Sequence, residues 1–358
     1  MTPIPTRSRP RVNAIATATP QCEVHHNYND WAERQLSGSR GAAIFHRMMA
    51  RSGIDQRFSV LSQDDGRIGF GSFYNAGASP GTAARMAHYA ASAPDLAVEA
   101  IGKLPELSGI THMVTASCTG FMAPGLDQVV ARRLGLPATV ERLFLGFMGC
   151  YAGITALRTA AMIVRADPAA RVLVLTVELC TLHMQDTDDL EQLLAMGQFA
   201  DGAAAAVVSA SGEGLALGEA LSLTLNDAAE LITWHVGDTG FAMHLSGAVP
   251  GRLVEQLEDP ATLREIVGAA GAEAIDSWAI HPGGRSILDA VERALDLPDD
   301  ALAHSREVLR TCGNMSSATV LFVLQRGMAQ RPEHGVALAF GPGLAVEGLH
   351  YAWHDHAG

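Results

Sequence analysis

The chain has 358 residues, of which 48% are hydrophobic and only 18% charged, and this is enough apolar sequence for a large buried core. Its formal net charge of −13 argues against a general nucleic-acid surface, because phosphate binding needs a basic face. No uncharged apolar run approaches the ~18 residues of a membrane-spanning helix, and residues 1–20 do not resemble a secretory signal. We therefore expect a cytoplasmic enzyme with no membrane span and no nucleic-acid partner.

Short apolar runs alternate with longer helical patterns along the chain, which indicates an α/β fold with mostly parallel central strands. In chain order, the predicted strands are Arg11–Thr17, Ile110–Ala116, Arg171–Glu178, Ala203–Ala210, Leu215–Thr224, Ser277–Ile280, Gly335–Phe340 and Leu344–Trp353. The predicted helices are Asn29–Arg51, Gly81–Lys103, Pro124–Leu134, Ala152–Arg165, Gly251–Ala270, Ser286–Leu295, Ala301–Arg310 and Met315–Met328.

The two halves of the chain repeat one order of elements, although their residues do not match. Each half runs strand, helix, strand, a sharp turn into a helix, and then a closing pair of strands. The small-residue stretch Ser211–Gly214 separates the two runs. The pattern predicts a divergent duplication, with an N-terminal half of residues 1–213 and a C-terminal half of residues 214–358.

Cys118 lies at the junction of a predicted strand and a helix expected to begin near Pro124, a residue favoured at the first helical position. A cysteine in such a turn feels the positive end of the helix, which lowers the pKa of the thiol and makes it a better nucleophile. The alternative is a small buried hydrophobic residue. The five cysteines are widely spaced and include no Cys-x-x-Cys pair, so we expect neither a disulfide framework nor a metal site.

His281 and Asn314 occupy sharp turns in the second half of the chain. A predicted strand ends at His281, and the following Pro-Gly-Gly prevents its continuation, so the imidazole is expected to point toward a cleft. Asn314 is predicted to open a helix, because asparagine is a good N-cap residue. A hydrogen-bonded core histidine and a purely structural cap are the alternatives. Further on, Gly341-Pro342-Gly343 suits either a close approach to a ligand or an ordinary turn.

The order Cys, His, Asn fits two kinds of chemistry. In papain-like proteases a thiolate–imidazolium pair cleaves amides, but the Cys-Gly-x-Cys-aromatic signature is missing and Cys118 lies far from the N-terminus. The other chemistry is acyl transfer followed by Claisen condensation on a thiolase-like scaffold. In that reaction Asn314 donates a hydrogen bond to an enolate oxygen without acting as a base.

Taken together, four segments resemble those of the type III polyketide synthases, the chalcone and stilbene synthase family. They are Cys118–Gly125, His281–Gly284, Gly313–Ala318 and Phe340–Leu344, in the family order and at family-like spacing. The resemblance extends over nearly the whole chain and implies a homodimer whose subunits have a thiolase-like, duplicated α-β-α-β-α fold with five layers. It also implies an acyltransferase that uses an acyl-CoA starter and malonyl-CoA, with no metal or redox cofactor.

The resemblance assigns roles to particular residues. Cys118 carries the acyl chain, and His281 and Asn314 complete a catalytic triad. Phe199 is the aromatic gate between the cavity and its access tunnel, with a core phenylalanine as the alternative.

Arg47 and Arg51 fall where the family places cations for the phosphates of coenzyme A. Their spacing of four puts both on one helix face. A third basic position of that set is Ile44 here, which weakens the phosphate site or moves part of it elsewhere. A solvated surface pair is the alternative.

Residues expected around the cavity depart from the plant members of the family. Met243 replaces a second phenylalanine near the gate, and Trp234 falls where plant enzymes carry a small residue. Cys180 and His183 fall at cavity-lining positions in a stretch that looks like bacterial members, several of which take fatty-acyl starters. A flexible methionine and a changed cavity floor fit a non-aromatic or long starter. Further residues expected at the cavity are Ser316, Gly341, Pro342 and Gly343.

The predicted activity is iterative condensation followed by closure to a pyrone, a resorcinol or a related ring, and two other functions stay open. A ketoacyl-synthase III-like enzyme would use the same three residues for one condensation, with its extender on a carrier protein. A non-catalytic thiolase-fold subunit that binds acyl-CoA would be expected to lack one of the three, and none is missing.

Overall fold

The computed structural model describes residues 9–61, 71–74, 79–268 and 271–355. The strands are β1 Arg11–Ala18, β2 Cys22–Glu23, β3 Phe58–Ser59, β4 His112–Ser117, β5 Glu141–Gly146, β6 Arg171–Leu179, β7 Asp201–Ser209, β8 Gly214–Thr224, β9 Ile232–Gly237, β10 Gly240–Leu245, β11 Ser277–Ile280, β12 Gly335–Gly341 and β13 Ala345–His354. The α-helices are α1 His25–Gln35, α2 Arg40–Met49, α3 Thr82–Gly102, α4 Leu126–Arg133, α5 Ala152–Ala166, α6 Leu190–Met196, α7 Val249–Leu257, α8 Pro260–Val267, α9 Arg285–Ala294, α10 Ala303–Cys312 and α11 Thr319–Met328.

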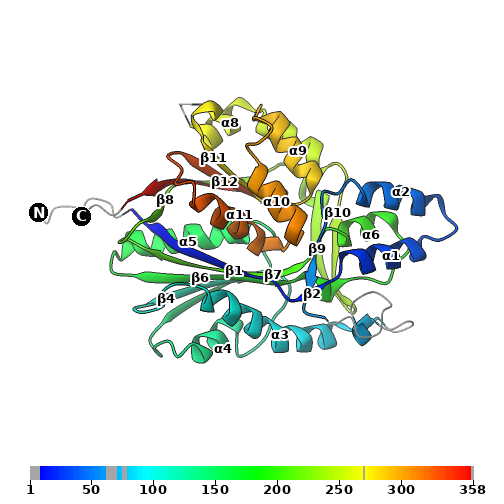
Figure 1. The fold of residues 1–358 in the computed structure, drawn as a ribbon, viewed down its shortest axis with the longest axis horizontal. Coiled ribbons are helices and arrows are strands. Elements are labelled where there is room, and N and C mark those ends of the chain that lie inside the picture. Colours follow the sequence, from blue (N-terminus) through cyan, green and yellow to red (C-terminus); the bar gives the residue numbers. More distant parts are fainter. Residues whose placement is uncertain (1–8, 62–70, 75–78, 269–270, 356–358) are drawn as a thin grey trace, which may run out of the picture.

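A nine-stranded mixed sheet, in the order β11-β12-β13-β8-β1-β7-β6-β4-β5, organises the molecule. The part from β11 to β8 and the part from β1 to β5 lie on opposite sides of the central helices α5 and α11 (Figure 1). Helices α3 and α4 cover one outer face, and α8 and α9 lie at the other. This arrangement confirms the predicted five-layer α-β-α-β-α fold.

Side-chain alternation along the strands explains why helices pack on both faces of the sheet. In β6, Leu173, Leu175 and Val177 belong to the outer core, whereas Val172 and Val174 belong to the core around the central helices. Strand β12 alternates in the same way, with alanines toward the central helices and larger residues outward. Small residues on the inner faces leave room for α5 and α11 between the two parts of the sheet.

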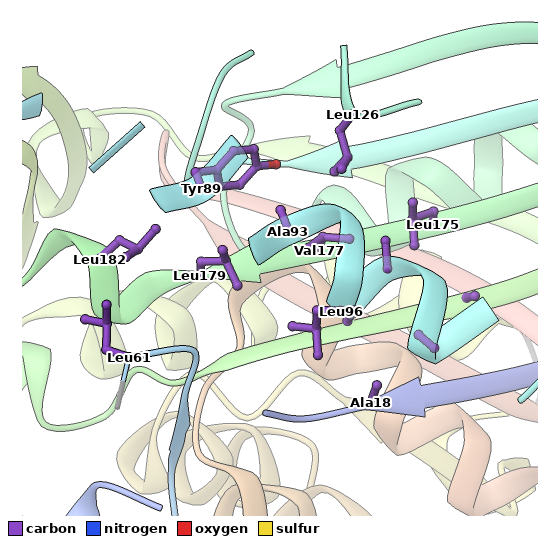
Figure 2. Close-up of a cluster of buried hydrophobic side chains, with 14 of the residues drawn as sticks. Ala18, Leu61, Tyr89, Ala93, Leu96, Leu126, Leu175, Val177, Leu179 and Leu182 are labelled. Atoms are coloured by element: carbon purple, nitrogen blue, oxygen red, sulfur yellow. The ribbon is translucent and has the colours of Figure 1, made fainter. Parts of the chain in front are cut away.

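The outer core of the first half sets the position of the end of β4. Figure 2 shows Ala93 and Leu96 of α3 beside Val177 of β6 in one apolar cluster. One helical turn before Ala93, the Tyr89 hydroxyl donates to or accepts from Ser117 Oγ at 2.7 Å. This hydrogen bond fixes α3 against Ser117, the last residue of β4, which directly precedes Cys118.

Several predicted elements differ from the structure. The predicted helix Asn29–Arg51 is two helices, because Gly38 adopts a left-handed φ of 79° between them. The predicted helix Gly251–Ala270 is also two, because Asp259 caps a new helix whose first residue is Pro260; its predicted end at Ala270 lies outside the described residues. Within the large sheet only the pairs β11–β12, β4–β6 and β4–β5 are parallel, so the expectation of mostly parallel strands is wrong.

Strand β5, helix α6 and the hairpin β9–β10 were not predicted from the sequence. Strand β5 is an edge strand that begins with exposed charged residues, so it lacks the apolar run of a central strand. Helix α6 and strand β10 contact each other beside the sheet and contribute to the site described below. In the part of the chain that the structure describes, no helix combines the length and the apolar character needed to cross a membrane.

Candidate active site

A cavity of about 460 Å³ collects residues from both halves of the chain. Cys118 follows β4, His281 follows β11, and Asn314 lies between α10 and α11, and all three line this cavity. A second thiol, that of Cys150, lines it as well. The fold therefore brings a carboxamide and an imidazole together with the thiols of Cys118, Cys150 and Cys180, of which the sequence analysis did not name Cys150.

Cys118 is surrounded by groups that disfavour a thiolate. Its Sγ lies 3.2 Å from Oε1 of Glu178, and its backbone N–H donates to Oε2 of the same carboxyl group at 3.0 Å. Burial raises the pKa of the Cys118 thiol well above its ordinary value, and the adjacent Glu178 raises it further. Helix α4 begins at Leu126, close to the expected start near Pro124, but an irregular segment separates Cys118 from the start of the helix. The physical reason for predicting a reactive Cys118 does not hold.

Cys150 lies just before the start of a helix, which is the setting that was expected for Cys118. It lies in the turn directly before α5, where the N–H of Ala152 already donates to the carbonyl of Gly149 at 3.1 Å. The positive end of this 15-residue helix favours a thiolate. Burial raises the pKa of the Cys150 thiol to about 11, while hydrogen-bond contacts with the side chains of Ser316 and Asn314 oppose that shift.

The turn Gly341-Pro342-Gly343, in the C-terminal half of the chain, packs against the turn that contains Cys150 and fixes it. Gly149 has a left-handed φ of 83°, and a Cβ on it would lie 2.5 Å from Cδ of Pro342. A Cβ on Gly341 would lie 3.4 Å from the backbone nitrogen of Cys150. Gly341 and Pro342 line the cavity, whereas Gly343 lies in the turn behind it. The predicted close approach is therefore an approach to the Cys150 backbone.

His281 is an isolated imidazole at the end of β11. Its backbone N–H continues the pairing with β12 by donating to the carbonyl of Leu338 at 2.8 Å. Neither ring nitrogen has a hydrogen-bond partner among the described residues, although the side chain is almost completely buried. Burial lowers the pKa of His281 to about 3, so the ring is neutral in the empty cavity. A buried polar group without a partner is costly, which marks the ring as one that serves a ligand.

Asn314 is held by backbone pairing and not by a helix cap. Its N–H donates to the carbonyl of Gln198 at 2.9 Å, and its carbonyl accepts from the N–H of Ala200 at 2.9 Å. Helix α11 begins at Thr319 with Ala318 at its N-cap, so the prediction that Asn314 opens a helix is wrong. A tertiary bridge to the segment around Phe199 replaces the local cap.

Hydrogen bonds orient the Asn314 side chain. Its Oδ1 accepts from the backbone N–H of Ser316 at 2.8 Å, and its Nδ2 donates to the carbonyl of Gly283 at 3.2 Å. With the oxygen occupied, the remaining donor capacity of the amide is directed to the Cys150 side of the site. The carboxamide can therefore donate to an anion that forms near Cys150.

Ser316 links the two thiols. Its Oγ lies 3.1 Å from Sγ of Cys118 and also contacts the Cys150 thiol. Ser316 has a left-handed φ of 47°, which is unusual for a residue with a side chain and is typical of functional sites. The strained backbone points this hydroxyl between the two sulfur atoms.

Comparison with known proteins identifies the family. The N-terminal domain of the chalcone and stilbene synthases matches residues 6–212, and the C-terminal domain of the same family matches residues 216–352. The chain belongs to the chalcone and stilbene synthases. It is therefore a type III polyketide synthase, an enzyme of the acyltransferase type.

Three relatives show how far the similarity of the synthase extends. The alpha-pyrone synthesis polyketide synthase-like protein Pks18 of Mycobacterium tuberculosis is 33% identical, over 97% of this chain and 92% of the relative. The structure of PKS-I from the brown alga Ectocarpus siliculosus superimposes with a TM-score of 0.85 at 27% identity, over 97% of this chain and 98% of that one. The C-terminal type III polyketide synthase domain of Steely1 from Dictyostelium gives a TM-score of 0.86 at 27% identity, over 96% and 99%.

Seven of the nine residues expected around the cavity of the synthase line it: Phe199, Trp234, Met243, Cys180, Ser316, Gly341 and Pro342. The Trp234 indole donates to the backbone carbonyl of Cys118 at 2.9 Å, so the tryptophan fills the floor of the cavity. His183 instead lines a small side cavity of about 30 Å³. Its two ring nitrogens are occupied by the Thr119 carbonyl at 2.7 Å and the Phe241 N–H at 3.0 Å, so His183 is structural.

The predicted phosphate-binding arginines of the synthase are both exposed. Arg47 lies in the last turn of α2, but α2 ends at Met49, so Arg51 follows the helix and does not share its face. Met48, next to Arg47, lines the cavity, so the arginines lie at its rim. Sequence reasoning missed Arg285 at the start of α9, whose Nη1 donates to the Arg51 carbonyl at 3.2 Å. Arg285 adds a third cation on the side of the cavity where Ile44 occupies a position that is basic in the family.

Proposed function

We propose that this type III polyketide synthase loads an acyl-CoA starter on Cys150, extends it repeatedly with malonyl-CoA and closes the product to a pyrone-type ring. The observation that carries the proposal is one buried cavity that holds a thiol at a helix start, an unbonded imidazole and an oriented carboxamide. Cys150 is preferred to Cys118 because it lies in the turn directly before helix α5 and burial raises the pKa of its thiol to about 11, whereas burial raises the pKa of the Cys118 thiol well above its ordinary value.

Loading begins with transfer of the Cys150 proton to the neutral His281 ring. The thiolate attacks the starter carbonyl, the carbon–sulfur bond to coenzyme A breaks, and the leaving thiolate takes the proton back from the imidazolium. Thioester exchange suits this pair because the attacking and the leaving sulfur have similar basicity. The products are an acyl-enzyme and free coenzyme A.

Extension uses His281 and Asn314 as hydrogen-bond donors. Malonyl-CoA loses carbon dioxide, and the negative charge moves to its thioester oxygen as an enolate. Donors that face this oxygen stabilise the transition state, and one such donor is typically worth roughly 3–4 kcal/mol. The enolate carbon then attacks the Cys150 thioester and releases the sulfur, so the chain passes to coenzyme A and returns to Cys150 for the next round. The buried, largely apolar cavity excludes water from the enolate.

A linear aliphatic starter fits the lining of the cavity. Trp234 and Met243 stand where an aromatic starter would need open space, and the leucines of α6 continue the wall. The mycobacterial relative at 33% identity is named for alpha-pyrone synthesis, which supports a pyrone as the product here. Arg47, Arg51 and Arg285 at the rim provide positive charge for the phosphates of coenzyme A.

The decisive experiment is incubation of the purified enzyme with a panel of acyl-CoA starters and malonyl-CoA, without any carrier protein. We expect triketide or longer pyrones by mass spectrometry. A single condensation that needs a malonylated carrier protein would indicate the ketoacyl-synthase III-like alternative. An unchanged intact mass after mixing with acyl-CoA would indicate a non-catalytic subunit.

A homodimer completes the proposal. Strand β5 is an edge of the nine-stranded sheet and exposes Leu143, and Phe121 in the loop after β4 is also exposed. Exposed apolar side chains at a free strand edge favour association with a second copy. Analytical ultracentrifugation should show a dimer for the wild type and a monomer for Leu143→Lys. A cytoplasmic location and the division of the chain at residues 213 and 214 stay predictions.

A further inference from the structure

Arg57 is a fully buried arginine behind the gate, and the chemistry described above does not use it. Its Nη1 donates to the backbone carbonyls of Phe199 at 2.7 Å and Met196 at 3.2 Å. Its Nε donates to Nδ1 of His25 at 3.0 Å. The guanidinium thus binds two carbonyl groups of the short segment that leads from α6 to Phe199.

Main-chain pairing connects this segment to Asn314. The carbonyl of Gln198 and the N–H of Ala200, on either side of Phe199, are both paired with Asn314 at 2.9 Å. The stem of Arg57 also packs under the preceding residue, because a Cβ on Gly313 would lie 2.8 Å from Cγ of Arg57. Arg57 therefore binds the Phe199 side of the bridge through its guanidinium, and its aliphatic stem lies beside Gly313, the residue before Asn314.

The surroundings of Arg57 explain how a buried charge is tolerated. Met196 is the last residue of α6, so its carbonyl belongs to the negative end of that helix. The guanidinium lies 4.7 Å from the centre of the Tyr28 ring, in a cation–π contact. Burial lowers the pKa of Arg57 to about 10, so the group stays charged at neutral pH. An apolar side chain of the same size would fill the space without a buried charge, so the bonds to the carbonyls are the feature that requires arginine.

Phe199 connects Arg57 to the cavity in which the reaction is proposed to occur. Its side chain borders both the main cavity and the side cavity of about 30 Å³, and Arg57 lines the latter. A shift of the Phe199 backbone would therefore move the wall between the two cavities and, through the bridge, the Asn314 carboxamide. The Cys150 turn is held separately, by Gly341 and Pro342.

We propose that Arg57 is a positioning residue for the extension step. It fixes the Phe199 backbone and, through the bridge, the position of the Asn314 carboxamide relative to Cys150. The inference rests on the proposed function. Because Cys150 is held by other contacts, loss of Arg57 should affect malonyl-CoA decarboxylation much more than loading of the starter. A purely structural arginine would lower both in proportion to the folded fraction.

The test compares Arg57→Met with Arg85→Met in the full-length enzyme. Arg85 is a matched control, because it is equally buried and its Nη1 also donates to two backbone carbonyls, those of Leu182 and Met184, away from Asn314. Two rates are measured for each variant: acylation of Cys150 by an acyl-CoA, followed by intact mass, and carbon dioxide release from malonyl-CoA. Melting temperatures report the folded fraction.

We expect Arg57→Met to lower decarboxylation by at least about tenfold and acylation by less than about threefold, while Arg85→Met leaves their ratio unchanged. Equal losses in both rates, or the same change of ratio in Arg85→Met, would overturn the proposal. If Arg57→Met does not fold, Arg57→Lys and Gly313→Ala probe the same contact, and each must still lower the ratio. A wild type that releases no carbon dioxide from malonyl-CoA would instead refute the proposed function.

Discussion

Cys118 and Cys150 are two of the three cysteines that line the cavity, and they differ in the elements around them. Cys118 directly follows strand β4 and precedes an irregular loop. Its Sγ lies 3.2 Å from Oε1 of Glu178. Cys150 stands at the first turn of a central helix and contacts an amide and a hydroxyl. Burial raises the pKa of both thiols, Glu178 raises both further and Ser316 opposes the rise at both, but Asn314 opposes it at Cys150 and not at Cys118.

The comparison teaches that a position in the cavity does not make a thiol reactive. A thiolate needs positive potential and hydrogen-bond donors; Ser316 contacts both thiols, but of the two only Cys150 also lies beside a helix start and the Asn314 carboxamide. Glu178 has the opposite effect on Cys118, and its own pKa is raised by burial although four donor groups, two of them hydroxyls, point at it. The variants below test this difference, from the largest expected effect to the smallest.

The strongest test exchanges each thiol in turn. Cys150→Ala should abolish formation of the acyl-enzyme, a loss of more than about a thousandfold, because no other thiol has a favourable environment. Cys118→Ala should still load the starter within about tenfold of the wild-type rate. Intact mass after mixing with an acyl-CoA measures both. Loading that disappears in Cys118→Ala and persists in Cys150→Ala would restore the assignment made from the sequence.

Removal of the carboxamide should separate the two steps at the same sulfur. We expect Asn314→Ala to slow decarboxylation of malonyl-CoA by about a hundred- to a thousandfold, since one donor to the enolate oxygen is lost. Acylation of Cys150 should change far less. Rapid-quench kinetics of carbon dioxide release and of acyl-enzyme formation give the two rates. An equal loss in both would mean that Asn314 acts on the thiol and not on the enolate.

The pH dependence of alkylation tests the pairing of Cys150 with His281. Burial, partly opposed by hydrogen bonds from Ser316 and Asn314, raises the pKa of the thiol to about 11, so an unpaired thiol alkylates faster with each unit of rising pH up to that value. An imidazolium partner lowers the thiol pKa, so the wild type should reach its plateau at a lower pH than His281→Gln. Iodoacetamide kinetics with peptide mapping supply the profile of each. Identical profiles would show that the two groups do not form an ion pair.

The smallest effect concerns the unreactive thiol. Replacing Glu178 by Gln removes the carboxylate that raises the pKa of Cys118, so the thiolate fraction of Cys118 at a fixed pH should rise, by about tenfold for each unit of lowered pKa. Peptide mapping after brief alkylation measures the extent of modification of Cys118 in the variant and in the wild type. No increase at Cys118 would mean that burial alone controls its reactivity.

Most of the fold could be predicted because it depends on local pattern. The central strands and the helices α3, α5 and α9 follow apolar periodicity, and the strand Ser277–Ile280 has the predicted limits. Strand β5 and the hairpin β9–β10 were missed, because edge strands with polar faces carry little of that signal.

The site was found only in part for the same reason. His281 and Asn314 were identified, since each lies in a turn with a distinctive sequence, although the reason given for Asn314 was wrong. A signal for Cys150 was present in the sequence: the predicted helix Ala152–Arg165 begins two residues after it. The rule that a cysteine before a helix start is activated points to Cys150 more directly than to Cys118.

The sequence alone determined the family, the alternation of strands and helices and the turns that contain His281 and Asn314, because these depend on neighbouring residues and on recognisable motifs. Only the tertiary structure distinguishes the surroundings of Cys118 and Cys150, since it places Glu178 against the Cys118 sulfur and the Asn314 amide beside Cys150. It also decided what Arg57 binds. Electrostatic environments are made by residues that are distant along the chain, and their effect falls off over a few ångströms, so they exist only once the chain has folded.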